Sequence, residues 1–169
     1  MKKGFITVAT GKEQYYILAR NLLRPYRDNC QTKRFSFAII ADAENEYTKE
    51  FDDVIILKNA SKSWMDKIEI LKVCPYDENI FIDADCLIYR DINFFGDLFK
   101  VADDFSCFGE VLLLDSKEGW FTKDTANSYQ IYFITHLHGI ICFVRRGSKI
   151  DEMHRLLKGH WFGSGKDLG

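Results

Sequence analysis

The stretch NIFIDADCLIYRDI, residues 79–92, decides how the rest of the chain is interpreted. It begins with the apolar composition of a buried strand, yet two aspartates, Asp83 and Asp85, follow at once. Two carboxylates this close repel each other and are costly to remove from water, so a positive partner is expected. Alternation along an extended segment predicts that both face one way. Such oxygen donors suit Mg²⁺ or Mn²⁺, and a turn or helix cap is the structural alternative.

Strand and helix patterns alternate on the N-terminal side of this stretch. Apolar, β-branched runs predict strands at residues 4–10, 34–42, 53–58 and 79–85. Helices are predicted between them, from about Tyr15 to Pro25, over 44–51, and from Trp64 to just before Pro75. A last helix from Ile150 should bury Met153, Leu156 and Leu157. This order predicts an α/β fold with a mostly parallel sheet flanked by helices, in which ligands bind beyond the carboxyl ends of the strands.

Composition and charge exclude several classes of protein. The chain of 169 residues is 47% hydrophobic with two prolines, which argues against disorder and fits one domain. Lys and Arg total 23 against 25 acidic residues, so no nucleic-acid partner is expected. The apolar run at 5–9 is too short for a signal peptide or transmembrane segment. The five cysteines form no C-x-x-C pair, so free thiols and a cytoplasmic location are expected.

Three segments together resemble a known family. YDENIFIDADCLIYRDINFFGDLF at 76–99 resembles the central block of nucleotide-sugar glycosyltransferases with the GT-A fold, most closely family 8, which includes glycogenin and bacterial galactosyl- and glucosyltransferases. ITVATGKEQY at 6–15 is similar to the family's first strand and the loop that grips uridine, and WMDKIEIL at 64–71 to the segment before D-x-D. The resemblance implies a Rossmann-like GT-A fold and transfer of a hexose from a UDP-sugar to a glycan-type acceptor, with retention.

The resemblance also implies the roles of individual residues. Asp83 and Asp85 match the catalytic pair that holds Mn²⁺ or Mg²⁺ against the donor diphosphate, whose departing charge must be neutralised. His138 and Gly139 stand where the family has Asn and Gly, which changes the expected sugar preference. The implied donor-binding residues are Ala9, Thr10, Tyr15, Lys67, Asp83, Ala84, His138 and Gly139.

The C-terminal region departs from the family pattern. HWFGSGK matches the family's H-x-x-G-x-x-K, with His160 at the third metal ligand and Lys166 at the diphosphate. It follows Gly139 too closely for the usual intervening helices, and three loosely spaced positions also match by chance. We therefore expect one GT-A-like catalytic domain over residues 1–169 that is a compact variant or truncated at its C-terminus.

Two alternatives stay open. Haloacid-dehalogenase-type phosphatases also end a strand in D-x-D and use the first Asp as a nucleophile beside Mg²⁺. Their motif lies on the first strand and continues with Gly-Thr or Val-Thr, whereas Cys86 and Leu87 follow here. The second alternative is a fragment or subunit that binds a nucleotide sugar without turnover.

Overall fold

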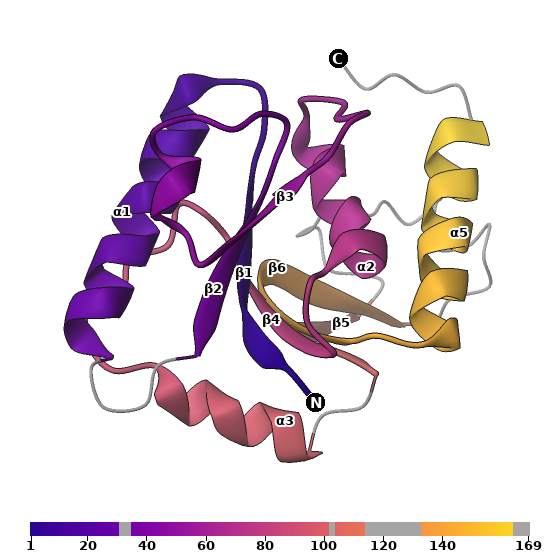
Figure 1. Cartoon of the computed structure of the whole chain (residues 1–169). Coiled ribbons are helices and arrows are strands. Elements are labelled where there is room, and N and C mark those ends of the chain that lie inside the picture. The colour runs from indigo at the N-terminus through magenta and orange to yellow at the C-terminus, as the bar shows by residue number, and fades with distance from the viewer. Residues whose placement is uncertain (31–34, 102–103, 114–132, 164–169) are drawn as a thin grey trace.

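The fold is organised around one six-stranded sheet in the order β3-β2-β1-β4-β6-β5 (Figure 1). The computed structural model describes residues 1–30, 35–101, 104–113 and 133–163. Within these ranges, only the backbone is described for residues 98, 101, 106–113, 133–142, 157 and 159–163. Four strands are mutually parallel: β1 (Lys3–Ala9), β2 (Ser36–Ala41), β3 (Asp53–Ile56) and β4 (Glu78–Ile82). β6 (Phe133–Arg145) and β5 (Phe105–Leu113) join antiparallel. The predicted α/β class with a mostly parallel sheet is confirmed.

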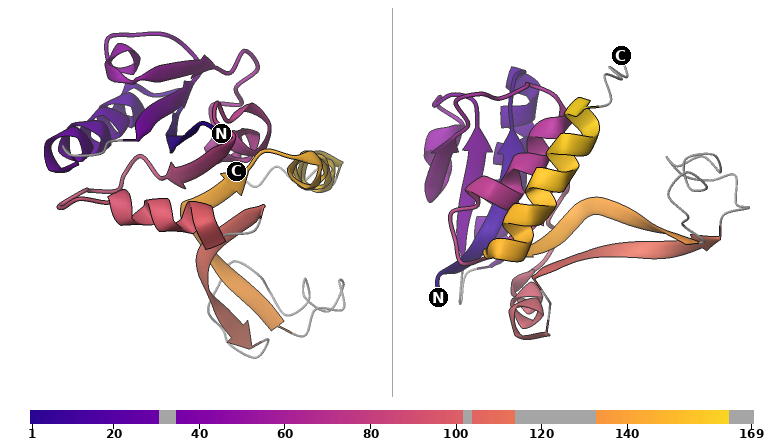
Figure 2. Two further views of the ribbon diagram at one scale, coloured as in Figure 1. Left: turned by 60° about the horizontal axis from the view of Figure 1, so that its bottom comes forward. Right: turned by 90° about the vertical axis from the view of Figure 1, so that its right-hand side faces the viewer.

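Both faces of the sheet are covered, which explains why its central strands are almost continuously apolar. Along β1, Phe5 and Ala9 enter the core beneath α1 (Glu13–Asn29), and Ile6 and Val8 enter the opposite core. η3 (Asn93–Asp97) and α3 (Leu98–Val101) adjoin the first core. α2 (Ile70–Val73) and α5 (Ser148–Gly163) lie side by side over the second (Figure 2).

The first helix is longer than predicted. α1 continues through Pro25 to Asn29, although proline removes a helical N–H donor and its ring crowds the preceding turn. The last turn is held by Tyr26, which is fully buried and donates a hydrogen bond from its hydroxyl to the Phe35 carbonyl at 2.8 Å. Tertiary packing of this turn therefore outweighs the local cost of the proline.

Two other helices are shorter or tighter than predicted. The acidic segment forms only η1 (Thr48–Glu50), a 3-10 turn. Asn45 stabilises its start, because Asn45 Oδ1 accepts hydrogen bonds from the backbone N–H groups of Tyr47 and Thr48. The helix before Pro75 is present, but its first part is the 3-10 helix η2 (Trp64–Glu69), and α2 follows.

The last helix begins at Ser148 and buries a partly different face from the one predicted. Ile150 is buried and Met153 packs against the second core, but Leu156 is 56% exposed, and the side chain of Leu157 is not described. Among the described side chains of α5, the other buried one is His154. His154 Nε2 lies 3.3 Å from Glu69 Oε2, and Lys158 forms an ion pair with the same carboxylate. Polar contacts to η2 therefore select the packed face, which an apolar pattern alone does not predict.

Two expectations about the class of protein can be compared with the structure. No helix within the described parts of the chain is long and apolar enough to cross a membrane. The three cysteines whose side chains are described, Cys30, Cys74 and Cys86, are free thiols, as predicted.

Candidate functional site

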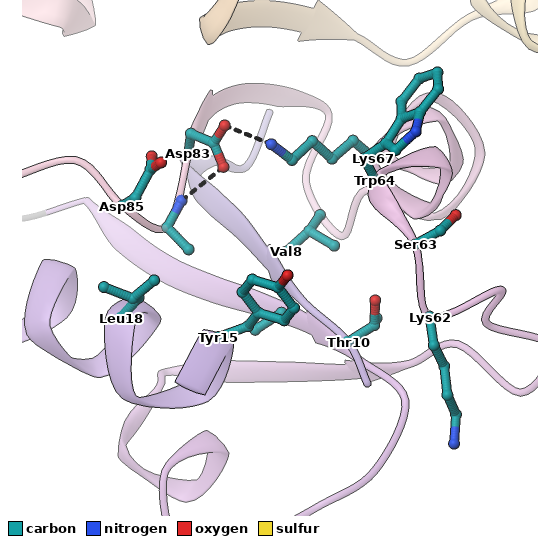
Figure 3. A pocket seen from close by; sticks show the side chains of 12 residues that line it. Val8, Thr10, Tyr15, Leu18, Lys62, Ser63, Trp64, Lys67, Asp83 and Asp85 are labelled. Atoms are coloured by element: carbon teal, nitrogen blue, oxygen red, sulfur yellow. Dashed lines mark hydrogen bonds and ion pairs between the residues drawn. The ribbon is translucent and has the colours of Figure 1, made fainter. Parts of the chain in front are cut away.

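A cavity lies at the edge of the sheet where the parallel strands end. β1, β2 and β4 end at Ala9, Ala41 and Ile82, so the polar residues Thr10, Asp42 and Asp83 follow at one edge. The cavity has a volume of about 220 Å³. Seven predicted site residues line it (Figure 3): Ala9, Thr10, Tyr15, Lys67, Asp83, Ala84 and Asp85. The structure thus brings together residues from three separate segments of the chain.

The two aspartates lie on a turn and not on an extended strand. β4 ends at Ile82, and the backbone N–H of Cys86 donates to the Asp83 carbonyl at 3.1 Å, which closes a turn over 83–86. The Ala84 N–H donates to Asp83 Oδ1 at 3.0 Å. The prediction that strand alternation aligns both carboxylates was therefore wrong, because the strand stops before them. Both nevertheless line the cavity.

Asp83 has the positive partner that the sequence leads one to expect, and that partner is a lysine. Lys67 Nζ lies 2.5 Å from Asp83 Oδ2, with the lysine side chain 40% exposed and the aspartate 18% exposed. Lys67 projects from η2, whereas Asp83 follows β4, so tertiary packing forms the pair (Figure 3). Asp85 is exposed. The turn therefore presents one paired and one solvated carboxylate to the cavity.

The donor set of this turn fits part of the shell of a hard divalent cation. Two carboxylates that face one cavity supply oxygen ligands, and Mg²⁺ commonly completes its shell with waters and substrate phosphates. The Lys67 ammonium beside Asp83 shows that this position accepts positive charge. Among the described residues, no three side chains of His, Cys, Asp or Glu form a candidate metal site.

The opposite wall of the cavity is organised by Asp66, which is 3% exposed. Its Oδ2 accepts hydrogen bonds from Thr10 Oγ1 at 2.6 Å and from the Lys62 N–H at 2.9 Å. Its Oδ1 accepts from the N–H and the hydroxyl of Ser61, each at 2.7 Å. One carboxylate thereby joins the end of β1 to the segment that brings Lys62, Ser63 and Trp64 to the cavity.

Asp42 supports the same wall from behind. It accepts hydrogen bonds from the Tyr16 hydroxyl and from the Gly11 N–H, the latter at 3.0 Å. Burial alone would raise the pKa of Asp42, but these hydrogen bonds outweigh it and lower that pKa. Gly11 has φ of +85°, and a Cβ there would lie 3.0 Å from the Lys62 Cβ. This position therefore favours glycine both for its backbone conformation and for the close approach of the two loops.

Two aromatic side chains line the cavity from different elements. Tyr15 comes from the first turn of α1 and is 38% exposed, and Trp64 opens η2 and is 59% exposed. Exposed rings on the wall of a polar cavity can stack against the face of a planar ligand. Only Tyr15 was among the predicted site residues.

The remaining predicted site residues belong to β6 and α5, where the structure describes only their backbone. β6 pairs Ile141 with Ile82, so His138 and Gly139 come just beyond the end of β4, on the side where the turn 83–86 begins. His138 is paired with Phe108 of β5. His160 and Gly163 lie in the last turns of α5, and Lys166 is outside the described residues.

Sequence reasoning missed Asp66 and much of the wall that it supports. A signal was present in SKSWMD at 61–66, because Ser63 caps η2 by accepting from the Met65 N–H and an aspartate in the first turn is typical of a helix start. That signal predicts a helix boundary. It does not reveal that the carboxylate also reaches Thr10, which lies far away in the sequence.

Several solved structures with a similar fold are glycosyltransferases. The bifunctional glycosyltransferase WbbM has a TM-score of 0.60 at 13% identity, over 93% of this chain and 34% of WbbM. GlyE from Streptococcus pneumoniae TIGR4 has a TM-score of 0.59 at 10% identity, over 100% of this chain and 40% of GlyE. The galactosyltransferase LgtC, solved with donor and acceptor sugar analogues, has a TM-score of 0.59 at 8% identity, over 98% of this chain and 66% of LgtC.

The chain thus spans about a third of the length of WbbM and two fifths of that of GlyE. No protein-family model and no curated protein sequence matches the chain. At these identities the likeness concerns the fold, and it does not distinguish family 8 from other glycosyltransferases. The predicted GT-A fold is confirmed.

Proposed function

We propose that this chain carries the donor site of a glycosyltransferase that moves a hexose from a nucleotide diphosphate sugar, with UDP as the nucleotide. One observation carries the proposal: the two carboxylates of the turn 83–86 and the wall built around Thr10 face one cavity. A diphosphate at the carboxylates and a base at the wall would occupy its two ends. The GT-A fold of the chain supports the same reading.

Asp83 and Asp85 would hold Mn²⁺ or Mg²⁺ against the diphosphate. A bound divalent cation supplies Lewis-acid stabilisation of the departing nucleoside diphosphate. Lys67 adds a second positive charge, because its ammonium already lies in the cavity beside Asp83 and can turn toward a phosphate oxygen. Ala84, between the two carboxylates, is buried and contributes its small side chain to the cavity lining.

The nucleoside would lie at the other end of the cavity. Tyr15 and Trp64 offer ring faces for the base, and Thr10 offers a hydroxyl at the end of β1. Ala9 lines the cavity beside Thr10 with a side chain small enough to admit a flat ligand. His138 and Gly139 lie on β6 just past Ile141, the last residue that pairs with β4, and the hexose would extend from the diphosphate toward them.

The acceptor in this proposal is a glycan-type hydroxyl that attacks from the face of the departing diphosphate, so that the anomeric configuration is retained. The family resemblance suggests this course, and product analysis tests it directly. Proton NMR of the first product formed from an α-linked donor should show an α-linkage.

The decisive experiment is calorimetric binding of UDP to the wild type, with and without Mn²⁺. We expect binding that depends on Mn²⁺ and that falls about 100-fold or more in Asp85→Ala, because a lost ligand weakens the site that neutralises the diphosphate. Asp97→Ala is a matched control, since Asp97 is an exposed carboxylate paired with Lys100 outside the cavity.

The outcomes separate the proposed function from its alternatives. Wild-type binding that ignores both Mn²⁺ and the Asp85 substitution would contradict a metal-held diphosphate. Release of hexose from UDP-glucose or UDP-galactose would support transfer, whereas tight binding without turnover would favour a donor-binding subunit. Phosphate release from a simple phosphomonoester would favour the phosphatase alternative.

A further inference from the structure

Asp66 differs from Asp83 and Asp85 because it is buried and accepts four hydrogen bonds from the protein, two on each carboxylate oxygen. Two of its partners are the backbone N–H groups of Ser61 and Lys62, which can only donate. The other two are the hydroxyls of Thr10 and Ser61, each with one proton. Each oxygen of the Asp66 carboxylate accepts two hydrogen bonds. The carboxylate is therefore held in one orientation and acts only as an acceptor.

This arrangement determines how the Thr10 hydroxyl is presented to the cavity. Thr10 is 6% exposed, and its Oγ1 lies 2.6 Å from Asp66 Oδ2, so its single proton points toward the carboxylate. The remaining hydrogen-bonding capacity of that oxygen is its lone pairs. Thr10 also lines the cavity (Figure 3). It therefore offers a ligand an acceptor and no donor.

We propose that Asp66 is a specificity-determining residue that fixes the Thr10 hydroxyl as a hydrogen-bond acceptor and so selects a nucleobase presenting an N–H group. This inference rests on the proposed function, because it concerns which nucleotide the same cavity binds. Uracil carries an N–H at N3, whereas cytosine has an unprotonated acceptor nitrogen at that position. An acceptor on the protein therefore favours uracil there and leaves a cytosine nitrogen facing a lone pair.

Asp66 also makes the selecting hydroxyl part of a rigid unit. The same carboxylate holds Ser61 and Lys62, and the Ser61 hydroxyl lies 2.8 Å from that of Ser63, which lines the cavity. Because the Ser61 proton is committed to Asp66, Ser63 donates to Ser61. Thr10 and the neighbouring wall thus hold their positions relative to each other through one buried group.

The test compares three probes in the presence of Mn²⁺: UDP, CDP and N3-methyl-UDP, in which a methyl group replaces the uracil N–H. Wild-type protein should bind UDP about 10-fold or more tightly than either analogue, because a buried acceptor is left unpaired by them. Thr10→Val keeps the shape of the side chain and removes the hydroxyl. Its preference for UDP over N3-methyl-UDP should fall, and what remains should reflect only the steric bulk of the methyl group on the base. Thr10→Ser should restore the preference.

Asp66→Asn tests the role of the carboxylate itself. An amide accepts only on its oxygen, so its NH₂ group must face one of the two donor pairs. Where it faces Thr10 and the Lys62 N–H, the Thr10 hydroxyl accepts from the amide and its proton is free to point into the cavity; in the other orientation the NH₂ group faces Ser61. We expect the preference for UDP over CDP to fall about 5-fold or more. Asp52→Asn is the matched control, because Asp52 accepts from the Phe37 N–H and pairs with Arg27 at the far end of β3.

The ratio of the affinities for UDP and its analogues, and not the affinity for UDP alone, distinguishes a role in base selection from a purely structural role of Asp66. If Asp66→Asn weakens UDP and CDP equally, or if Thr10→Val keeps the full wild-type preference, the inference is overturned while the proposed function stands. If wild-type protein binds no UDP with Mn²⁺, the proposed function fails and the inference fails with it. Circular dichroism of each variant establishes that it is folded before binding is compared.

Discussion

The two ends of the cavity carry aspartates in opposite electrostatic situations. Asp66 is buried and is satisfied by four donors from the protein itself. Asp83 and Asp85 lie on a turn at the cavity, where one is paired with a partly exposed lysine and the other is exposed. A carboxylate whose acceptor sites are filled by the protein stabilises the fold, whereas one that keeps acceptor sites open can bind a ligand.

The largest effect should come from removing each kind of carboxylate in turn. Asp66→Ala leaves buried donors unpaired and should lower the free energy of unfolding by about 3 kcal/mol. Asp83→Ala breaks a partly exposed ion pair and should cost less than about 1 kcal/mol. Its binding of UDP with Mn²⁺ should nevertheless fall by about 100-fold.

Urea unfolding and calorimetry on the same preparations check this prediction. Each variant serves as the control for the other, because stability and ligand binding should respond in opposite order. Equal losses of stability in the two variants would show that the two ends of the cavity do not differ in the way proposed.

A smaller effect should come from Lys67, which occupies the ligand end as a substitute cation. Lys67→Met keeps the length of the side chain and removes its charge, so Mn²⁺ alone should bind about 5-fold more tightly. Binding of UDP in the presence of Mn²⁺ should weaken, because the phosphates lose a positive partner.

Electron paramagnetic resonance of free Mn²⁺, measured with and without UDP, tests both the tighter binding of Mn²⁺ alone and the weaker binding of UDP with Mn²⁺. Lys72→Met is a suitable control, since Lys72 is an exposed lysine of α2 that does not line the cavity. A Lys67→Met protein that binds Mn²⁺ as weakly as the wild type in the absence of UDP would contradict competition between lysine and metal.

The smallest effect concerns the hydrogen bond from Tyr16 to Asp42 behind the wall. Burial and this hydrogen bond raise the pKa of Tyr16 from 10.0 to about 12. The folded protein therefore holds this proton more tightly than the unfolded chain, so the contribution is complete below pH 10 and is lost as the pH rises toward 12. Between pH 9 and pH 11 the wild type should lose about 1 kcal/mol more stability than Tyr16→Phe.

Urea unfolding at the two pH values measures this difference, and Tyr15→Phe is the control because Tyr15 is partly exposed at the cavity. The other tyrosines titrate in both proteins and cancel in the comparison. Parallel stability profiles for the wild type and Tyr16→Phe would contradict the raised pKa.

Much of the fold could be predicted because its central strands and helix faces have strong apolar patterns. The exceptions are positions where distant contacts outweigh a local preference. Tyr26 packs and bonds firmly enough to carry α1 through Pro25, and Glu69 attracts His154 to the buried face of α5 in place of Leu156. The Tyr26 ring packs against Phe5 of β1, and Glu69 lies 85 residues from His154, so neither contact falls within the short window on which a sequence pattern depends.

For the candidate site, the sequence by itself determined the residue types and the edge of the sheet at which they gather. An apolar strand followed by D-x-D places two carboxylates at the carboxyl end of the strand, whether the backbone there is extended or forms a turn. The sequence pattern did not predict the local turn on which these carboxylates lie, and only the tertiary structure decided that Lys67 meets Asp83 and that Asp66 reaches Thr10. The physical reason is that strand and helix patterns are local, whereas hydrogen bonds and ion pairs between separate elements form only when packing brings their ends together.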